Sequence, residues 1–593
     1  MNKRQLQKTI LSYPPLKDYL GDDDSKKKAC LKNLDEIASH YSTTFIKKIK
    51  PVVDMILSKM YDGINLEYPN DLDLLRLSKE NNLIFVPNHQ SHVDYIALNY
   101  AFFLKYGPKV PIHIAGGINL NIFPIGPIFR KLGCFFIRRT FSGNRNYRYT
   151  FEAYIYVLLK QGTPIEFFFE GGRSRTGRLM PPRFGLFNMI LDAHRILQEE
   201  GHKRPLLFVP VSIMHEFVPE EKSLTRELGG KKKKKESGAQ LIKLLRIFSK
   251  QFGTIHIKVG RPISKDEIQE QDPHQRVYKL AFRCYRSVGA GMSLTPTSLL
   301  TLIMMDAPSG ALTYESILKK TKDILDYCER FEVPTTSTLG KGDRERTMKR
   351  ALELLRKDQK IKPIQKDSLN RTFYVVESDR RLELLYFKNS ILHQFLTPFL
   401  INSIFIKMID GRASTVDQLK SILKEQRDLL KYEFYLPDAS EIIRKAFDII
   451  HHAIGRKVTT FGECFELSPD ELSKAVKVIH PFTSALNYIY EAHYVGCLGL
   501  KHLGNVPFTE KKFLDTAKAI HEIEHQHGRL IRFNESYSVP LLKNALKYYE
   551  NRSLLKQEDP GFLVTNLEGI DDLIDYLTKY LTEHLMFNLK TLH

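Results

Sequence analysis

A histidine and a carboxylate stand five positions apart in the run NHQSHVDY, which begins at Asn88 and ends at Tyr95. The apolar run LIFVP precedes it and predicts a buried strand. Residues five apart on a helix diverge by about 140°, so we expect His89 in the turn that leaves the strand and Asp94 in the first turn of a helix. A carboxylate that accepts from one ring nitrogen leaves the other nitrogen as a general base. The same residue types are also typical of an ordinary capped turn.

A second stretch, IEFFFEGGRSRTGRLMPP from Ile165 to Pro182, begins with an apolar run that predicts a strand and continues into polar residues. Glycine lets backbone N–H groups approach an anion, and the planar guanidinium group of arginine matches phosphate oxygens. The stretch places Glu170 before two glycines, Gly171 and Gly172, and closely spaced arginines, Arg173, Arg175 and Arg178. It therefore predicts a phosphate site, with a solvated basic loop as the alternative.

Together these stretches resemble the glycerolipid acyltransferase family, whose four motif blocks occur in the same order. The H-x-x-x-x-D block corresponds to His89 and Asp94. The remaining blocks are G-x-x-F-I-x-R at Gly133, Phe136, Ile137 and Arg139, E-G-x-R-S at Glu170, Gly171, Arg173 and Ser174, and a V-P-V strand from Val209 to Val211. The segments AGGINLNIFPIGPIFRKLGCFFIRRTFSGN and TRELGGKKKKKES further resemble the bacterial glycerol-3-phosphate acyltransferases. Gln90 departs from the arginine usual in that group, and Gly172 departs from the threonine of many relatives.

This resemblance implies an enzyme, a glycerol-3-phosphate 1-O-acyltransferase. Such an enzyme moves a fatty acyl group from acyl-CoA or acyl-carrier protein to sn-glycerol 3-phosphate and gives lysophosphatidic acid, the first step of phospholipid synthesis. His89 would act as the general base and Asp94 would orient its ring. The resemblance implies no metal and no cofactor, because the acyl donor is itself a substrate. Dihydroxyacetone phosphate is the alternative acceptor, since it needs the same base and the same phosphate site.

The resemblance also implies which residues would bind the acceptor. These substrate-binding residues are Arg139, Glu170, Gly171, Gly172, Arg173, Ser174 and Arg175. Glu170 would position an acceptor hydroxyl or a neighbouring arginine. Arg178 and Pro210 are second-tier candidates, and we expect Pro210 at a strand end beside the site.

The composition favours a globular protein with an anionic partner. A chain of 593 residues is too long for one core, so two or three domains are expected. Its 89 Lys+Arg against 68 Asp+Glu give a net charge of +21, which suits a phosphate substrate, an acidic membrane or nucleic acid. No nucleic-acid-binding signature is visible, so nucleic-acid binding is a remote alternative. The six cysteines form no C-x-x-C pair, which argues against a cysteine zinc site and favours the cytosol.

We expect peripheral attachment to the cytoplasmic face of the inner membrane, through an anionic membrane surface. No apolar run is long enough to span a bilayer, and the nearest, Phe395 to Ile406, contains Pro398 and Asn402. The lysine run from Lys231 to Lys235 would supply charge, with a solvated loop as its alternative reading. The apolar contribution would come from Phe395, Leu396, Phe399 and Leu400.

Hydrophobic patterning divides the chain into three parts. Residues 1–80 read as a helical region interrupted by Pro51. Residues 81–270 alternate short apolar runs with helix-length segments, which predicts an α/β acyltransferase domain with a mostly parallel sheet flanked by helices. Ligands of such sheets bind beyond the carboxyl ends of the strands. Residues 271–593 predict a large C-terminal helical domain, and helix start signals stand at Ser264, Ser414 and Ser468.

One motif would support a different chemistry. The run HEIEH, from His521 to His525, matches the H-E-x-x-H pattern of zinc hydrolases. A charged residue, Glu524, lies inside this motif, and the candidate third ligands are Glu535 and Glu550. A zinc hydrolase is therefore a remote alternative.

Overall fold

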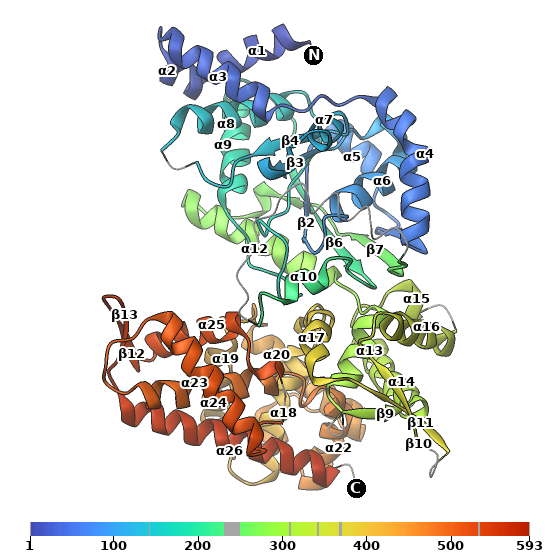
Figure 1. The fold of residues 1–593 in the computed structure, drawn as a ribbon, viewed down its shortest axis with the longest axis vertical. Coiled ribbons are helices and arrows are strands. Elements are labelled where there is room, and N and C mark those ends of the chain that lie inside the picture. The colour runs from blue at the N-terminus through green and yellow to red at the C-terminus, as the bar shows by residue number, and fades with distance from the viewer. Residues whose placement is uncertain are drawn as a thin grey trace. The chain divides into compact units, whose positions relative to one another are not determined.

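The computed structural model describes residues 2–141, 143–229, 250–307, 310–340, 343–366, 370–531 and 534–591. The chain forms two compact units (Figure 1). Unit 1 comprises Met1–Ser174, Leu179–Glu220 and Lys234–Ser293, and unit 2 comprises Arg175–Arg178, Glu221–Lys233 and Leu294–His593. The lysine run from Lys231 to Lys235 lies outside the described residues. The domain boundaries near residues 80 and 270 stay predictions.

Unit 1 is built on an eight-stranded sheet with the order β1-β7-β6-β2-β5-β3-β4, and β8 pairs with β6. The strands are β1 Gly63–Glu67, β2 Asn82–Pro87, β3 His113–Gly117, β4 Cys134–Ile137, β5 Ile165–Glu166, β6 Leu206–His215, β7 Thr254–Val259 and β8 Ile263–Ser264. Neighbouring strands run parallel except where β6 meets β7 and β8. The mostly parallel α/β sheet expected from the apolar runs is thus confirmed.

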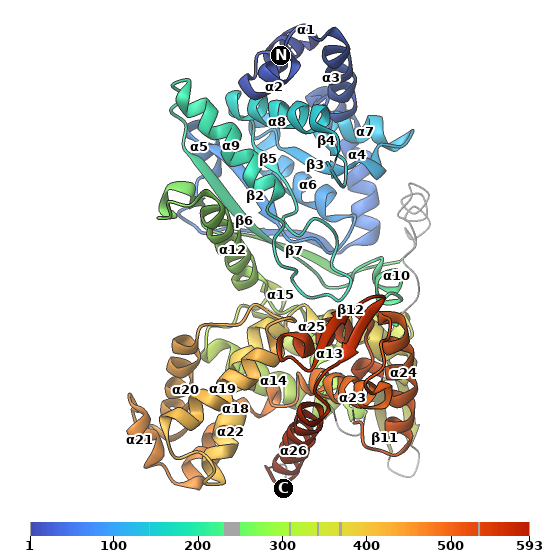
Figure 2. The same ribbon diagram turned by 90° about the vertical axis from the view of Figure 1, so that its left-hand side faces the viewer.

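Helices cover both faces of this sheet, with α9 and α12 on one side and α4 and α6 on the other (Figures 1 and 2). The strand β2 between them is buried on both faces, which explains why Leu83 to Val86 form an unbroken apolar run. The helices of unit 1 are α1 Lys3–Leu11, α2 Pro14–Leu20, α3 Asp24–Ile37, α4 Thr43–Met60, α5 Leu74–Glu80, α6 Asp94–Tyr106, α7 Ile125–Lys131, α8 Arg145–Lys160, α9 Gly185–Glu199 and α12 Pro273–Gly291.

The first eighty residues are helical, with two differences from the expectation. Pro51 does not end a helix but lies inside α4. A proline removes one backbone hydrogen bond and disturbs the turn before it, but the other hydrogen bonds of a long helix remain. The helix α4 therefore continues through Pro51. The segment also supplies the edge strand β1, which pairs in parallel with β7. The β1 sequence GINLE carries only two strongly apolar residues, which is why the apolar-run criterion missed it.

Unit 2 is mostly helical, as expected, and contains two small antiparallel sheets that the sequence did not predict. Its helices are α10 Glu221–Thr225, α13 Pro296–Met305, α14 Tyr314–Arg330, α15 Ser337–Gly340, α16 Arg344–Lys357, α17 Arg381–Asn389, α18 Leu396–Ile409, α19 Val416–Leu430, α20 Ala439–Ile454, α21 Phe461–Phe465, α22 Pro469–Ile479, α23 Asn487–Leu503, α24 Glu510–Gln526, α25 Val539–Asn551 and α26 Leu567–Thr591. Its strands are β9 Ala311–Thr313, β10 Lys362–Lys366, β11 Arg371–Val375, β12 Leu555–Glu558 and β13 Gly561–Val564.

The predicted helix start signals are partly confirmed. Ser468 caps α22 in a capping box with Glu471, as expected. Ser264 also forms a capping box, but the element that follows is a single 3₁₀ turn. At the third signal the cap is Thr415, one residue after the predicted Ser414, because Gln418 at the third helical position completes the box.

One helical segment, Leu392–Ile409, is long and apolar enough to cross a membrane by length and composition, which corrects the expectation that no run qualifies. Two thirds of it, 67%, is buried inside the protein. The side chains expected to enter a membrane, Phe395, Leu396, Phe399 and Leu400, are each at most 1% exposed. Burial of this kind is typical of the core helix of a folded domain, so these four residues belong to the core of unit 2.

Candidate active site

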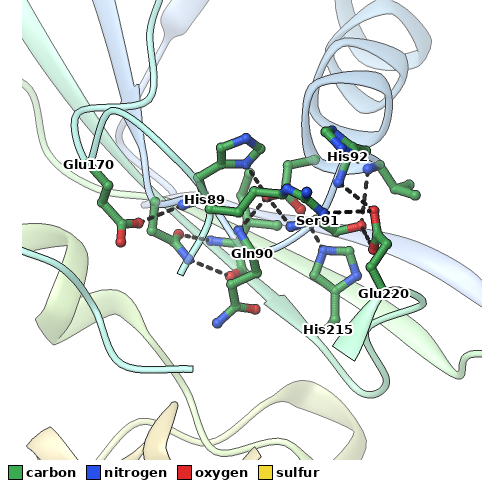
Figure 3. Close-up of polar contacts among 12 residues, drawn as sticks. His89, Gln90, Ser91, His92, Glu170, His215 and Glu220 are labelled. Atoms are coloured by element: carbon green, nitrogen blue, oxygen red, sulfur yellow. Dashed lines mark hydrogen bonds and ion pairs between the residues drawn. The ribbon is translucent and has the colours of Figure 1, made fainter. Parts of the chain in front are cut away.

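The strand β2 ends at Pro87, and a six-residue turn leads from it to Asp94, the first residue of α6. Within this turn the His89 ring donates from Nδ1 to Oδ2 of Asp94 at 2.9 Å (Figure 3). The His89 side chain is 12% exposed and stacks on Phe168 with ring centroids 4.0 Å apart. Because Nδ1 carries the proton, Nε2 is left as a proton acceptor. The local geometry expected for His89 and Asp94 is confirmed.

Asp94 is fully buried and accepts four hydrogen bonds. Its Oδ2 accepts from the backbone N–H groups of Gln90 at 2.7 Å and Ser91 at 2.9 Å in addition to His89. Burial alone would raise the pKa of this carboxyl, but hydrogen bonds from His215 and His89 outweigh burial and hold the pKa well below its usual range. Asp94 is therefore a fixed negative charge beside the His89 ring.

The fourth donor to Asp94 is His215, which the motif analysis did not single out. His215 is the last residue of β6, and its Nε2 lies 2.6 Å from Oδ1 of Asp94. His89 follows the carboxyl end of β2, and His215 stands at the carboxyl end of β6, the strand that pairs with β2. The strand-end rule that pointed to His89 could have found it, had the run LLFVPVSIMH been followed to its end.

Glu170 binds the backbone of the site and pairs with no neighbouring arginine among the described residues, while its expected contact with an acceptor hydroxyl stays a prediction. Its Oε1 accepts from the backbone N–H of His89 at 2.6 Å, and its Oε2 accepts from that of Met180 at 2.9 Å. Burial raises the pKa of Glu170 to about 8, although these backbone donors offset part of the rise. The backbone N–H of Ser174 donates in turn to the carbonyl oxygen of His89 at 2.9 Å. The E-G-x-R-S block thus brackets His89 through main-chain contacts.

A second residue that the sequence did not predict is the carboxylate Glu220, which lies on the other side of the turn from Glu170 (Figure 3). It accepts from the Ser91 hydroxyl at 2.7 Å and from the backbone N–H of His92 at 2.9 Å. The guanidinium of Arg173 lies 3.5 Å from the same carboxylate, and both side chains are buried. Glu220 therefore connects the histidine turn to the first arginine of the predicted phosphate site.

The other predicted ligands are spread over the two units. Arg139 belongs to unit 1 and is exposed in the segment after β4. Arg175 and Arg178 belong to unit 2, where Arg175 lies 3.6 Å from Glu227 and Arg178 pairs with Glu433. Within unit 1, the structure links Arg173 to the turn that holds His89 through Glu220.

The two glycines and Pro210 complete the set of predicted residues. Gly171 has a φ of 69°, a conformation that glycine adopts at no steric cost, and a Cβ at Gly172 would meet nothing within 4 Å. Pro210 lies inside β6 and not at its end, paired with Val86 of β2. The ends of β2 and β6 do not coincide because β6 continues four residues past Val211, the partner of Pro87.

Cation-binding geometry occurs once in the part of the chain that the structure describes, at Glu221, Asp358 and Glu383. The ammonium of Lys360 already lies among these carboxylates, at 2.7 Å, 3.0 Å and 2.5 Å respectively. We therefore interpret the cluster as a buried ion-pair network of unit 2.

The residues of the HEIEH motif have other partners. Glu524 pairs with Arg529 at 2.5 Å and accepts from the Tyr494 hydroxyl at 3.0 Å. Glu535, one candidate third ligand, forms a buried pair with Arg381 at 2.6 Å. In the described ranges these residues form no three-ligand group with His521 and His525.

A family model described as acyltransferase matches residues 71–214, which include the strands β2 to β5, most of β6 and the histidine turn. This part of unit 1 is therefore a domain of the acyltransferase class. A second model, the glycerol-3-phosphate acyltransferase C-terminal region, matches residues 225–558, more than half of the chain. The chain belongs to the glycerol-3-phosphate acyltransferase family.

Curated relatives agree with this assignment. Proteins named glycerol-3-phosphate acyltransferase from Shewanella baltica, Shewanella woodyi and Pseudomonas fluorescens are each 30% identical, over 73%, 78% and 73% of this chain. These matches cover 55%, 58% and 52% of the relatives, so the chain spans about half the length of the curated relatives it matches. A solved structure, the 1-acyl-sn-glycerophosphate acyltransferase PlsC from Thermotoga maritima, matches 48% of this chain and 96% of its own, at 16% identity with a TM-score of 0.22.

Proposed function

We propose that this protein transfers a fatty acyl group from a thioester, acyl-CoA or acyl-carrier protein, to the 1-hydroxyl of sn-glycerol 3-phosphate, which gives lysophosphatidic acid. The observation that carries the proposal is the His89–Asp94 pair, in which a buried carboxylate fixes the ring and leaves Nε2 as the base. The family assignment supports the choice of acceptor and donor.

In the proposed reaction the acceptor hydroxyl oxygen attacks the thioester carbonyl carbon while His89 Nε2 takes the hydroxyl proton. The new C–O bond forms as the carbonyl electron pair moves to oxygen. Return of that pair breaks the C–S bond, and the departing thiolate takes the proton from His89. Asp94 stabilises the transient imidazolium, because its charge is held 2.9 Å from the ring. The acceptor oxygen is itself the nucleophile, so we propose a reaction that needs no metal or prosthetic group.

Arg139 and Arg173 of unit 1 are the proposed phosphate ligands, because guanidinium groups form charge-assisted bonds to phosphate. A role for Arg175, which belongs to unit 2, stays a prediction from the sequence. Arg173 carries the strongest support, since Glu220 links it to the turn that holds His89. Its guanidinium already faces a carboxylate, so the acceptor phosphate would compete with Glu220 for this side chain. Gly172 would bring its backbone N–H toward the same anion. The N–H groups of Gly171 and Ser174 already donate to the carbonyl oxygens of Phe168 and His89.

A thiol-release assay with palmitoyl-CoA tests the proposal. We expect release of the coenzyme A thiol when glycerol 3-phosphate is added, and formation of a lysophosphatidic acid product. Dihydroxyacetone phosphate serves as the comparison acceptor at equal concentration, and glycerol without phosphate serves as the control for the phosphate site. Faster thiol release with dihydroxyacetone phosphate than with glycerol 3-phosphate would make dihydroxyacetone phosphate the acceptor. No thiol release with either phosphate would refute the proposed acyl transfer.

We further propose peripheral attachment at the cytoplasmic face of the inner membrane. The support is the net charge of +21 and a product that must enter lipid. Since Phe395, Leu396, Phe399 and Leu400 are buried, the proposed attachment is mainly electrostatic. Flotation with vesicles of graded anionic content should show binding that rises with anionic lipid and falls with salt. Failure to float with any vesicle would refute the proposal.

A further inference from the structure

The second histidine on Asp94 has no role in the proposed proton transfer. Both side chains of the His215–Asp94 pair are completely buried, and their contact of 2.6 Å is the shortest of the four that Asp94 makes. Among the described residues no other donor reaches Oδ1 of Asp94, whereas Oδ2 accepts three. One oxygen of the carboxylate is therefore held by His215 alone.

The sheet fixes the place of His215 relative to the turn. Pro87, the last residue of β2, pairs with Val211 of β6. The side chain of the next residue, Asn88, forms two hydrogen bonds with the backbone of Ile213 in the same strand. The Asn88 side chain donates to the carbonyl oxygen of Ile213 at 3.0 Å and accepts from its N–H at 2.7 Å. These bonds fix the position of β6 relative to the turn, two residues before His215. The pairing of the strands therefore places the His215 imidazole beside Asp94.

The protons of this pair follow from the donor and acceptor types. An ionised carboxylate only accepts, so His215 Nε2 carries the hydrogen. His215 Nδ1 is buried and has no hydrogen-bond partner in the described parts of the chain. The imidazole is thus a one-sided donor, aimed at Asp94 and shielded from solvent. Without it, a buried charged oxygen would lose its partner and the carboxylate could rotate away from His89.

We infer that His215 is a positioning residue for acyl transfer: it holds Oδ1 of Asp94 so that Oδ2 keeps the His89 ring in its reactive orientation. This inference rests on the proposed function. His215 touches neither the acceptor nor the thioester in this scheme, and it acts on the rate through Asp94 and His89.

Three variants test the inference in the full-length chain. Replacement by Phe (His215→Phe) keeps a planar ring but removes the donor. Glutamine (His215→Gln) places an amide N–H near the position of Nε2, and asparagine (His215→Asn) carries the same amide on a side chain too short to reach Asp94. We expect kcat to fall about 10- to 100-fold in the Phe and Asn variants, the loss of one hydrogen bond to a charged group. The Gln variant should recover most of that loss, and the KM for glycerol 3-phosphate should stay within about twofold in all three.

A merely structural role would give a different pattern. Thermal unfolding of each variant tests for such a structural role. If the Gln and Phe variants lost equal amounts of kcat and of stability, the inference would be overturned. An unchanged kcat in the Phe variant would also overturn it. If the Phe variant does not fold, the comparison of Gln with Asn carries the same test. A change confined to KM would also overturn it.

A readout that needs no turnover separates this inference from the proposed function. In protein labelled with ¹³C at histidine Cε1, the His89 signal is assigned by its loss in a His89→Ala variant. We expect this signal to shift in the Phe and Asn variants and to stay near its wild-type position in the Gln variant. An unshifted signal in the Phe variant would refute the coupling of His215 to His89, whatever reaction the protein catalyses. An inactive wild-type protein with the expected shifts would refute the proposed function alone.

Discussion

The turn from Asn88 to Asp94 and the loop from Gly171 to Arg178 both follow strands of the sheet, but their polar side chains find partners in opposite ways. In the turn, groups from distant parts of the chain converge on one carboxylate, because His89 and His215 both donate to Asp94. In the loop, neighbouring arginines diverge.

Each of the three loop arginines lies against a different acidic residue. Arg173 faces Glu220 in unit 1, whereas Arg175 faces Glu227 and Arg178 faces Glu433 in unit 2. Gly177 makes the last part of this loop possible, since a Cβ there would lie 1.9 Å from the carbonyl oxygen of Tyr386. Residues that are close in sequence thus have different partners here, so the turn and the loop should respond differently to substitution.

The largest expected effect is in the turn from Asn88 to Asp94. The His89→Ala substitution removes the base, and general-base catalysis contributes roughly 10²–10⁴-fold, so kcat should fall by that order while thermal unfolding changes little. Steady-state thiol release measures it. His274→Ala, at an exposed histidine of α12, is the matched control and should be fully active. A His89→Ala protein with more than about a tenth of wild-type kcat would contradict the general-base role.

In the loop from Gly171 to Arg178, the Arg178→Ala substitution should lower the stability of the protein. Arg178 is buried, pairs with Glu433, lies over the Phe434 ring at 5.1 Å and donates to the Tyr488 hydroxyl at 3.4 Å. Removing one member of a buried ion pair costs about 3–5 kcal/mol, so the free energy of unfolding should fall by that order in chemical denaturation. Arg195→Ala, at an exposed pair with Glu199, should cost less than about 1 kcal/mol and is the control. An Arg178→Ala protein as stable as the control, but with a raised KM for glycerol 3-phosphate, would instead make Arg178 a ligand.

Asp94→Asn should lower kcat with little effect on KM. The amide keeps the shape but removes the charge that favours the imidazolium, and its NH₂ group cannot accept from the donors around it. We expect a loss on the order of 10²-fold, since general-base efficiency depends on ring orientation. The measurement is the ratio of kcat values with palmitoyl-CoA, and a rise in KM at constant kcat would show that Asp94 acts in binding.

Arg173→Ala should raise the KM for glycerol 3-phosphate more than the KM for the acyl donor. A charge-assisted hydrogen bond is typically worth ~1.5–3 kcal/mol, which corresponds to about 10- to 100-fold. Arg173→Lys keeps the charge and should lose less. Together with Arg178→Ala this substitution sharpens the comparison, because one arginine of the loop should act on binding and the other on stability. A change in the donor KM alone would assign Arg173 to the coenzyme A phosphates.

The smallest effect concerns Glu166, a buried carboxyl at the end of β5. Burial raises the pKa of Glu166 to about 8, above the usual value of a glutamate, and one of its oxygens has no hydrogen-bond partner among the described residues. A raised pKa in the folded state means that stability is fully present below the unfolded pKa and is lost as pH rises through the folded pKa. We expect the free energy of unfolding to fall by on the order of 1–3 kcal/mol between pH 5.5 and 8.5, and less in Glu166→Gln. Identical pH profiles of both proteins would contradict this assignment.

Several features of the fold and the site followed from the sequence alone, because they depend on near neighbours in the chain. The apolar runs predicted β2, the start of β5 and the mostly parallel sheet. The five-residue spacing of His89 and Asp94 predicted their contact, since a short turn leaves few ways to arrange two such side chains. The capping box at Ser468 was predicted for the same reason.

Tertiary structure decided which distant residues join that local pair. His215 reaches Asp94 only because β6 lies beside β2 in one particular register, and no local pattern contains that pairing. Glu220 and Glu170 contact the turn although they lie in loops far along the chain. Arg175 and Arg178 belong to unit 2, whereas Arg173 belongs to unit 1. Spacing along the chain determines contacts within a turn, whereas contacts between strands depend on sheet order and register, which the whole fold sets.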